Sequence, residues 1–228
     1  MFVSRGCLLI SMILAIASGA PRTRITKSST PTWYLPCGET LEIDVNNEEA
    51  STDIDMKLYI QKLEIQHKLT LNDYLLQDYE YLYEKVRIGV NERQYIPNWI
   101  PGKKDVNAIV RLIKPTLSLQ TIVNHFPKLH MDLQKFAVAF EQLVEDETDP
   151  KIYKALHATQ IAIKSMLCEV EITIIDLPYL QIPSRVERTI MSSTEREPVD
   201  ETRRLVRDWG ILLKYKDYLH AWKHIFDR

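Results

Sequence analysis

Apolar residues recur at helical spacing in four long stretches of this chain and in one shorter stretch. The long stretches cover residues 53–88, 117–147, 149–175 and 199–227, and the short one covers 105–114. A Ser51, Thr52 or Asp53 cap is expected to open the first stretch, and Gly89 to end it. The pattern predicts an all-helical domain with four principal helices.

Each long stretch carries an apolar stripe that is expected to face the core. The first stripe is Ile54, Leu58, Ile65, Leu69, Tyr74, Leu75, Tyr79, Leu82 and Val86. The second is Leu119, Ile122, Val123, Phe126, Leu133, Phe136, Phe140, Leu143 and Val144. The third is Ile152, Leu156, Thr159, Ile163, Met166, Leu167, Val170 and Ile174, and the fourth is Leu205, Trp209, Leu212, Tyr215, Leu219, Trp222 and Phe226. We expect a kink at Pro127 and fraying of the β-branched residues 172–175.

The lengths of the connections constrain the directions of the helices. A helix of about 30 residues is ~45 Å long, so a connection that returns to its starting end needs roughly 13 extended residues. Only Thr148, Asp149 and Pro150 separate the second stretch from the third, so these two must be antiparallel neighbours. The other two connections are long. This predicts an up-up-down-down four-helix bundle with two crossover loops, the form known from long-chain helical cytokines.

The beginning of the chain has the pattern of an export signal. Arg5 precedes an apolar run from Cys7 to Ala17, and small residues follow up to a cleavage position after Gly19. We therefore divide the chain into a signal peptide (1–19), an irregular leader (20–52) and a bundle domain (53–228), and we expect a secreted, extracellular protein without membrane insertion after cleavage. Cleavage removes Cys7 and leaves Cys37 and Cys168 as an even pair in an oxidising compartment. The predicted topology places both at the same end of the bundle, which favours one disulfide between them.

Composition and motifs argue against most enzymes. Six glycines in 228 residues leave few places for phosphate-binding loops, and the net charge of −2 gives no global field for nucleic acid. The serine-hydrolase elbow Gly-x-Ser-x-Gly is missing from the sequence. His220 and His224 have metal-ligand spacing, but Ala221 stands where zinc proteases need Glu. We expect no catalytic, cofactor-binding or metal-binding residues.

Several aromatic and charged residues have both a structural and a functional interpretation. Tyr81 and Tyr83 point about 200° apart on a helix, so one of them should lie at the surface, where aromatic residues favour interfaces. Trp99, between Pro97 and Pro101, either covers the bundle or contacts a partner. The first helix is rich in acidic residues and the last in basic ones, which fits either solvated faces or faces that dock different partners.

The last helix, residues 203–226, resembles the fourth helix of the long-chain cytokines of the interleukin-6, leukaemia inhibitory factor and ciliary neurotrophic factor group. The closest stretch is Trp209-Gly210 followed by Leu212-Leu-Lys-Tyr-Lys216. The motif covers about 20 residues of the chain. The resemblance implies a receptor site at the start of this helix, where Arg204 and Arg207 replace the Phe and Lys of the group. Insect unpaired-type ligands look like divergent members of this group, and they are the other family to which this chain is similar.

Two functions follow as expectations. The first is a secreted cytokine that binds and brings together single-pass class I cytokine receptor ectodomains and activates JAK/STAT signalling. Its receptor-binding residues would be Arg204, Arg207, Trp209, Trp99, Tyr81 and Tyr83, and we expect charge reversal at Arg204 and Arg207 to weaken binding with little change in melting temperature. The alternative is a secreted helical carrier of a lipid or another apolar ligand, which would need a cavity between the helices.

Overall fold

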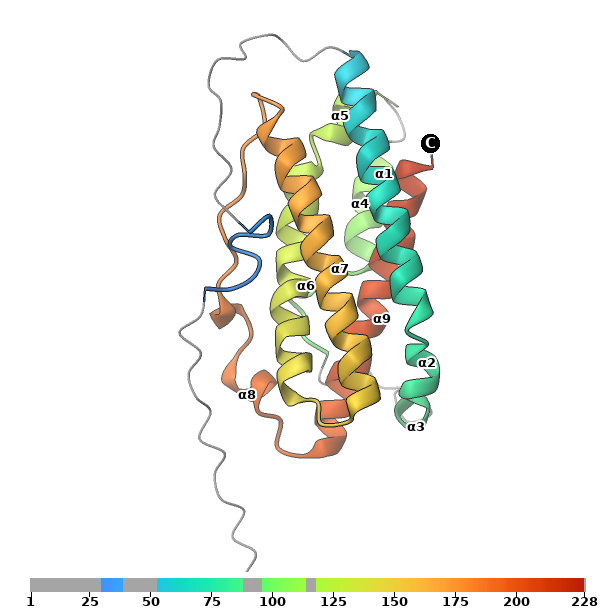
Figure 1. Ribbon diagram of the computed structural model, residues 1–228, viewed down its shortest axis with the longest axis vertical. Coiled ribbons are helices and arrows are strands. Elements are labelled where there is room, and N and C mark those ends of the chain that lie inside the picture. Colours follow the sequence, from blue (N-terminus) through green and yellow to red (C-terminus); the bar gives the residue numbers. More distant parts are fainter. Residues whose placement is uncertain (1–29, 39–52, 88–95, 114–117, 228) are drawn as a thin grey trace, which may run out of the picture. The chain divides into compact units, whose positions relative to one another are not determined.

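The described part of the protein is all-helical, as predicted (Figure 1). The structure is a computed structural model, and it describes residues 30–38, 53–87, 96–113 and 118–227. Four long helices are α1 (Asp53–Leu76), α6 (Phe126–Asp146), α7 (Pro150–Ile175) and α9 (Glu201–Phe226). The shorter elements are α2 (Tyr79–Leu82), α3 (Glu84–Arg87), α4 (Lys103–Ile113), α5 (Leu119–Val123), α8 (Ser193–Arg196) and the 3₁₀-helix η1 (Arg188–Ile190). The described residues form no β-strand. None of the described helices is long and apolar enough to cross a bilayer.

The predicted signal peptide, residues 1–19, lies outside the described residues. Of the predicted leader, only residues 30–38 are described, and they form turns. The helices belong to one compact unit, Pro31–Arg228.

The ends of α7 and α9 are set by side-chain caps. Asp149 accepts hydrogen bonds from the backbone N–H groups of Lys151 (2.7 Å) and Ile152 (3.2 Å), and Pro150 occupies the first turn, as predicted. Asp200 caps α9 by accepting from the N–H of Arg203 at 2.8 Å. The expected fraying of residues 172–175 is wrong, because α7 continues to Ile175. Burial of this last turn outweighs the lower helix propensity of its β-branched residues.

Two of the predicted helices are interrupted. The second was predicted as one helix with a kink at Pro127, but it is divided at Asn124 and His125 into α5 and α6, and Pro127 stands in the first turn of α6. The first was predicted as one helix to Ile88, but α1 ends at Leu76. Asp78 follows in the left-handed conformation with φ 49°, which breaks the α-helical hydrogen-bond ladder before α2 and α3.

The core face of α1 differs from the prediction. Leu58, Ile65, Leu69 and Leu75 were expected inside, but they are 52, 61, 53 and 46% exposed. The residues of α1 that face the core are instead Met56, Ile60, Leu63, His67, Thr70, Leu71 and Tyr74. Apolar residues occupy both faces of this helix, so periodicity alone does not select one. Tyr74 and Tyr79 are buried as predicted, and Leu82 and Val86 are half-buried against the core.

The stripes predicted for the later helices are confirmed. Every residue of the second, third and fourth stripes is buried or packs partly buried against one continuous core. In the centre of that core, the ring of Tyr215 contacts the rings of Phe136 (4.8 Å between centroids), Phe140 (5.3 Å) and Tyr74 (5.3 Å). These contacts join α1, α6 and α9 through aromatic packing.

Hydrogen bonds between the long helices define their relative directions. In α1, His67 bonds to the Leu219 carbonyl (2.9 Å) and Tyr74 donates to the Leu212 carbonyl (2.7 Å), so α1 and α9 are antiparallel. Tyr218 of α9 donates to Asp132 of α6 (3.2 Å), and Arg207 of α9 donates to Asp146 of α6 (2.8 Å), so α6 and α9 are antiparallel too. The turn after Asp146 makes α6 and α7 antiparallel (Figure 1). It follows that α1 runs parallel to α6, and α7 parallel to α9.

The connection between α7 and α9 is tied to the helices by partly buried polar contacts. Arg185 donates to both carboxylate oxygens of Glu171 (2.5 and 2.7 Å), and Arg188 donates twice to Glu141 (2.7 Å each). The disulfide predicted between Cys37 and Cys168 is present. It attaches residues 30–38, blue in Figure 1, to α7.

His67 provides a test of the α1–α9 contact through pH. Burial lowers the pKa of His67 to about 4, although its bond to the Leu219 carbonyl acts in the opposite sense. Between pH 6.5 and about 4 the unfolded chain binds a proton that the folded chain does not. The free energy of unfolding should therefore fall by about 3 kcal/mol as the pH falls from 6.5 to about 4. His67→Gln keeps an N–H donor for Leu219 and should flatten the pH profile in this window. Urea unfolding of both proteins across the window checks this, and parallel profiles would contradict it.

Candidate functional site

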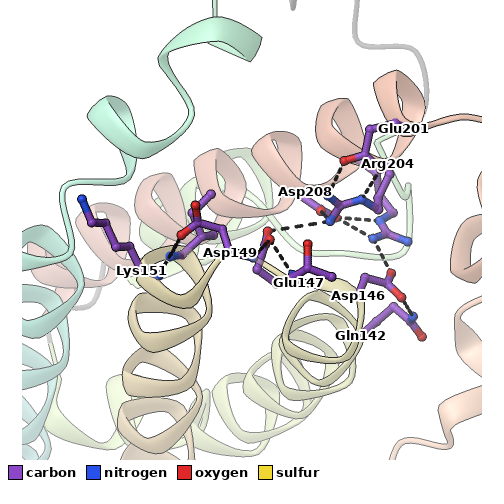
Figure 2. A network of polar contacts seen from close by, with 11 residues as sticks. Gln142, Asp146, Glu147, Asp149, Lys151, Glu201, Arg204 and Asp208 are labelled. Atoms are coloured by element: carbon purple, nitrogen blue, oxygen red, sulfur yellow. Dashed lines mark hydrogen bonds and ion pairs between the residues drawn. The ribbon is translucent and has the colours of Figure 1, made fainter.

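The start of α9 lies in a cluster of charged residues, here called the charged corner. Its members come from the end of α6 and its C-cap, from α8, and from the first turns of α9, and they are Asp146, Glu147, Glu195, Glu201, Arg204, Arg207 and Asp208. Figure 2 shows Asp146 and Glu147 at the end of α6 facing Arg204 and Asp208 of α9. This is the region where the sequence predicts a receptor site.

Arg207 is the centre of the charged corner. Its residue is 1% exposed, and its guanidinium donates to Asp146 (Nη2–Oδ2, 2.8 Å), to Asp208 (Nε–Oδ1, 2.8 Å) and to the Glu195 carbonyl (Nη1–O, 2.6 Å). One side chain thus joins α6, α8 and α9. The small effect on melting temperature predicted for charge reversal here would require an exposed side chain, whereas these bonds hold Arg207 beneath the surface.

Asp208 is the fully buried carboxylate of the corner. Burial raises the pKa of Asp208 to about 6, while the neighbouring guanidinium of Arg207 and then that of Arg204 act to lower it. Nearby Asp146 adds a further, smaller contribution in the raising direction. The carboxylate therefore depends on its arginine partners to remain ionised near neutral pH.

Arg204 forms the outer edge of the corner. Its Nε donates to Glu201 at 2.9 Å, and its Nη1 lies 3.4 Å from Asp208 and 3.8 Å from Glu147. The hydrogen bond with Glu201 raises the pKa of Arg204 and lowers that of Glu201. The side chain is 15% exposed, so only its edge is accessible to another molecule.

The turn between α6 and α7 borders the charged corner. Glu147 accepts hydrogen bonds from the backbone N–H groups of Thr148 (2.7 Å) and Asp149 (2.8 Å), and Asp149 in turn caps α7 (Figure 2). These bonds satisfy the backbone donors of a very short connection. They fix where the end of α6 presents Asp146 to Arg207.

Trp99 and the segment around α8 extend the corner to the surface. The Trp99 side chain is half-buried, and its Nε1 donates to Glu195 at 3.2 Å. Glu195 also lines a surface depression of about 270 Å³, together with Val199, Arg203 and Arg207 among others. Val199 is strongly exposed there. An apolar residue and an arginine at the rim of a depression are features that suit contact with another protein.

The remaining predicted contact residues, Tyr81, Tyr83 and Trp209, divide between the surface and the core. Tyr81 is 72% exposed and Tyr83 is 2% exposed, which confirms that one of this pair lies at the surface. Trp209 is buried and stacks on Tyr83 at 6.0 Å between ring centroids. Both are therefore packing residues. Gly210, the next residue, lets Ile96 approach, because an added Cβ would lie 2.4 Å from Ile96 Cγ1.

Sequence reasoning missed Asp146, Glu195 and Asp208. A signal existed for Glu195, since Ser192-x-x-Glu195 is a capping box, and the structure forms it with Ser192 accepting from the Glu195 N–H and Glu195 accepting from the Ser192 N–H. Asp146 has no local signal, because its partner Arg207 becomes a neighbour only through packing of α6 on α9. Asp208 stands next to Arg207 in the sequence, but its complete burial depends on the packing of α9 and has no local signal.

Chemically, the charged corner is a structural clamp with an accessible rim. The guanidinium groups of Arg204 and Arg207 both bond to carboxylates, an arrangement that fixes the position of α8 and of the first turns of α9. Comparison of the chain with models of protein families, with curated proteins and with solved structures yields no match. The functional argument therefore depends on the residues of this chain.

Proposed function

We propose that this protein is a secreted helical cytokine, an up-up-down-down four-helix bundle that binds single-pass receptor ectodomains and brings two of them together. The observation that carries the proposal is the set of helix directions. The hydrogen bonds that join α9 to α1 and to α6, with the short turn from α6 to α7, make the two earlier long helices parallel to each other and opposite to the later two. This order is the one found in growth hormones and cytokines.

Parallel consecutive helices need long connections, and the chain has them. A 24-residue helix such as α1 is about 36 Å long, so a return connection needs about 10 extended residues. Residues 77–125 separate α1 from α6, and residues 176–200 separate α7 from α9. Both are long enough to cross the length of a helix, whereas the turn from α6 to α7 is not.

The packed centre supports a ligand for receptors over a carrier of apolar molecules. A carrier needs interior volume, but the rings of Tyr74, Phe136, Phe140 and Tyr215 contact one another where α1, α6 and α9 meet. The disulfide between Cys37 and Cys168 supports an oxidising compartment. Both observations fit an extracellular ligand with a solid core.

Two surfaces are proposed to contact receptors. One is the rim of the charged corner, with the edge of Arg204, Trp99 and the depression beside Val199. The other includes the exposed ring of Tyr81 on α2. Aromatic and arginine residues are the types that contribute most at protein interfaces. Two separate surfaces on one ligand would let it bridge two receptor chains.

The test is receptor-dependent signalling by the purified protein. We expect phosphorylation of STAT proteins in responsive cells and binding to at least one cytokine-receptor ectodomain. Tyr81→Ala should weaken binding at least about 10-fold, as expected for an interface aromatic residue. Tyr179→Ala, a second exposed tyrosine (45%), is the matched control and should bind normally. The absence of binding to every ectodomain, together with stoichiometric lipid in an extract of the protein, would favour the carrier.

A further inference from the structure

The outward face of α1 carries a second regular apolar pattern, which the bundle core does not use. The residues of this face, here called the outer seam, are Leu58, Lys62, Ile65, Leu69, Asn72 and Leu76. All six are exposed, and Leu76 is 78% exposed. Their spacings are four, three, four, three and four residues, which is the alternation of a coiled-coil seam. The inward face is buried separately through Met56, Ile60, Leu63 and their neighbours.

The pattern of residues along the outer seam is symmetric about its middle. Its apolar members lie symmetrically about position 67, with Leu58 matched by Leu76 and Ile65 matched by Leu69. At about 100° per residue, the four side chains lie within about 40° of one line along the helix, over a length of about 27 Å. A second copy of α1 laid antiparallel on the first would therefore set apolar residues against apolar residues along the whole seam.

The two polar positions of the seam select the direction of pairing. In an antiparallel pair, Lys62 faces Asn72 of the other copy, whose amide oxygen can accept its N–H, and Asp73 lies beside that position. In a parallel pair, Lys62 would face the other Lys62, so that like charges would meet in the seam. A single polar seam position commonly fixes register and direction in this way.

We propose that the outer seam of α1 is a docking surface for a second copy of this chain, forming an antiparallel, two-fold symmetric dimer. A two-fold interface must be self-complementary, and the outer seam meets this requirement in its spacing and in the Lys62–Asn72 match. A shallow depression bordered by Leu58, Lys62 and Ile65 lies along the seam and can receive the facing side chains. The inference concerns assembly and does not depend on the receptor function proposed above.

The affinity should be modest. A single pair of helices about 27 Å long gives an interface at the lower end of the size found for specific complexes, where weak and transient contacts occur. Sedimentation of the full chain from about 1 µM to about 1 mM should therefore show a shift from monomer to dimer. A monomer over the whole range would overturn the proposal, whether the seam is covered by a receptor or by another segment of the chain.

Variants of the seam test the surface. Ile65→Glu with Leu69→Glu places charges at the centre of the apolar pairing and should raise the dissociation constant at least about 100-fold. Both positions are exposed, so far-ultraviolet circular dichroism and the melting temperature should change little. The matched control is Leu112→Glu on α4, where an equally exposed leucine lies off the seam and the dimer should persist. Equal dissociation by the control would overturn the assignment to α1.

Cross-linking tests the direction. In the antiparallel dimer, Leu58→Cys and Leu76→Cys proteins mixed under mild oxidation should form a cross-linked heterodimer, while each variant alone should not cross-link, because the two copies of each position lie about 27 Å apart. In a parallel dimer each variant would link to itself. Self-linking of the single variants, or the absence of a product from the mixture, would overturn the antiparallel arrangement.

Discussion

Replacing Arg207 with Ala is expected to lower the free energy of unfolding by about 3–5 kcal/mol, as for other broken buried ion pairs. Its guanidinium donates to the partly buried carboxylate of Asp146, to the fully buried carboxylate of Asp208 and to the Glu195 carbonyl. Among the described residues, the ion pair that Asp208 then keeps is with Arg204, whose Nη1 is 3.4 Å away. Urea unfolding at neutral pH, followed by circular dichroism, measures the loss. This expectation replaces the earlier one that charge reversal at Arg207 would leave stability unchanged.

A control variant and a double-mutant cycle test whether Arg207 stabilises the fold through its specific contacts, as a clamp, or only through its positive charge. Arg203→Ala removes a neighbouring arginine whose side chain is 42% exposed, and should change stability by less than about 0.5 kcal/mol. Asp208→Asn removes the buried charge that Arg207 neutralises. The cost of Arg207→Ala combined with Asp208→Asn should fall below the sum of the single costs by more than about 1 kcal/mol. Additive costs, or equal losses for Arg203→Ala and Arg207→Ala, would show that Arg207 is not a clamp.

The elements predicted best from the sequence are those whose apolar residues occupy one face only. For α7, the stripe from Ile152 to Ile174, the Asp149 cap and Pro150 all indicate the same helix, and the structure confirms them. For α1, apolar residues at both the core face and the outer seam satisfy helical spacing equally well. Periodicity therefore established the helix but selected the wrong face. The break at Asp78 had no signal, since neither glycine nor proline stands there.

The charged corner could be predicted only in part. The resemblance of residues 203–226 to a cytokine helix directed attention to the start of α9, where the corner lies. Its geometry was not accessible, because Asp146 and Glu195 are separated from Arg207 by 61 and 12 residues and meet it only through packing. An arginine on a polar stretch of helix is usually solvated, and only the position of α6 and α8 over this one shows that it is buried.

Removal of the disulfide by Cys37→Ser and Cys168→Ser is expected to destabilise the protein by roughly 4–5 kcal/mol in the chain-entropy model. The bond closes a loop between positions 131 residues apart, so the unfolded chain gains much freedom when it is lost. The folded state should change little, because Trp33 holds the same segment. Its ring is fully buried, and its Nε1 donates to the Val186 carbonyl at 2.7 Å.

Because the disulfide and Trp33 both hold the same segment, the origin of the stabilisation by the disulfide can be tested. The double serine variant should unfold at lower urea but keep the near-ultraviolet signal of its aromatic core, because Trp33 remains packed and Arg188 stays over its ring at 5.6 Å. Trp33→Ala with the disulfide intact should cost about 3–5 kcal/mol by leaving a cavity. A reducing agent should reproduce the loss in the natural chain and leave the serine variant unchanged, which controls for the substitutions. If the serine variant is as stable as the natural chain to within about 1 kcal/mol, the loop between Cys37 and Cys168 does not restrict the unfolded state as the entropy model requires.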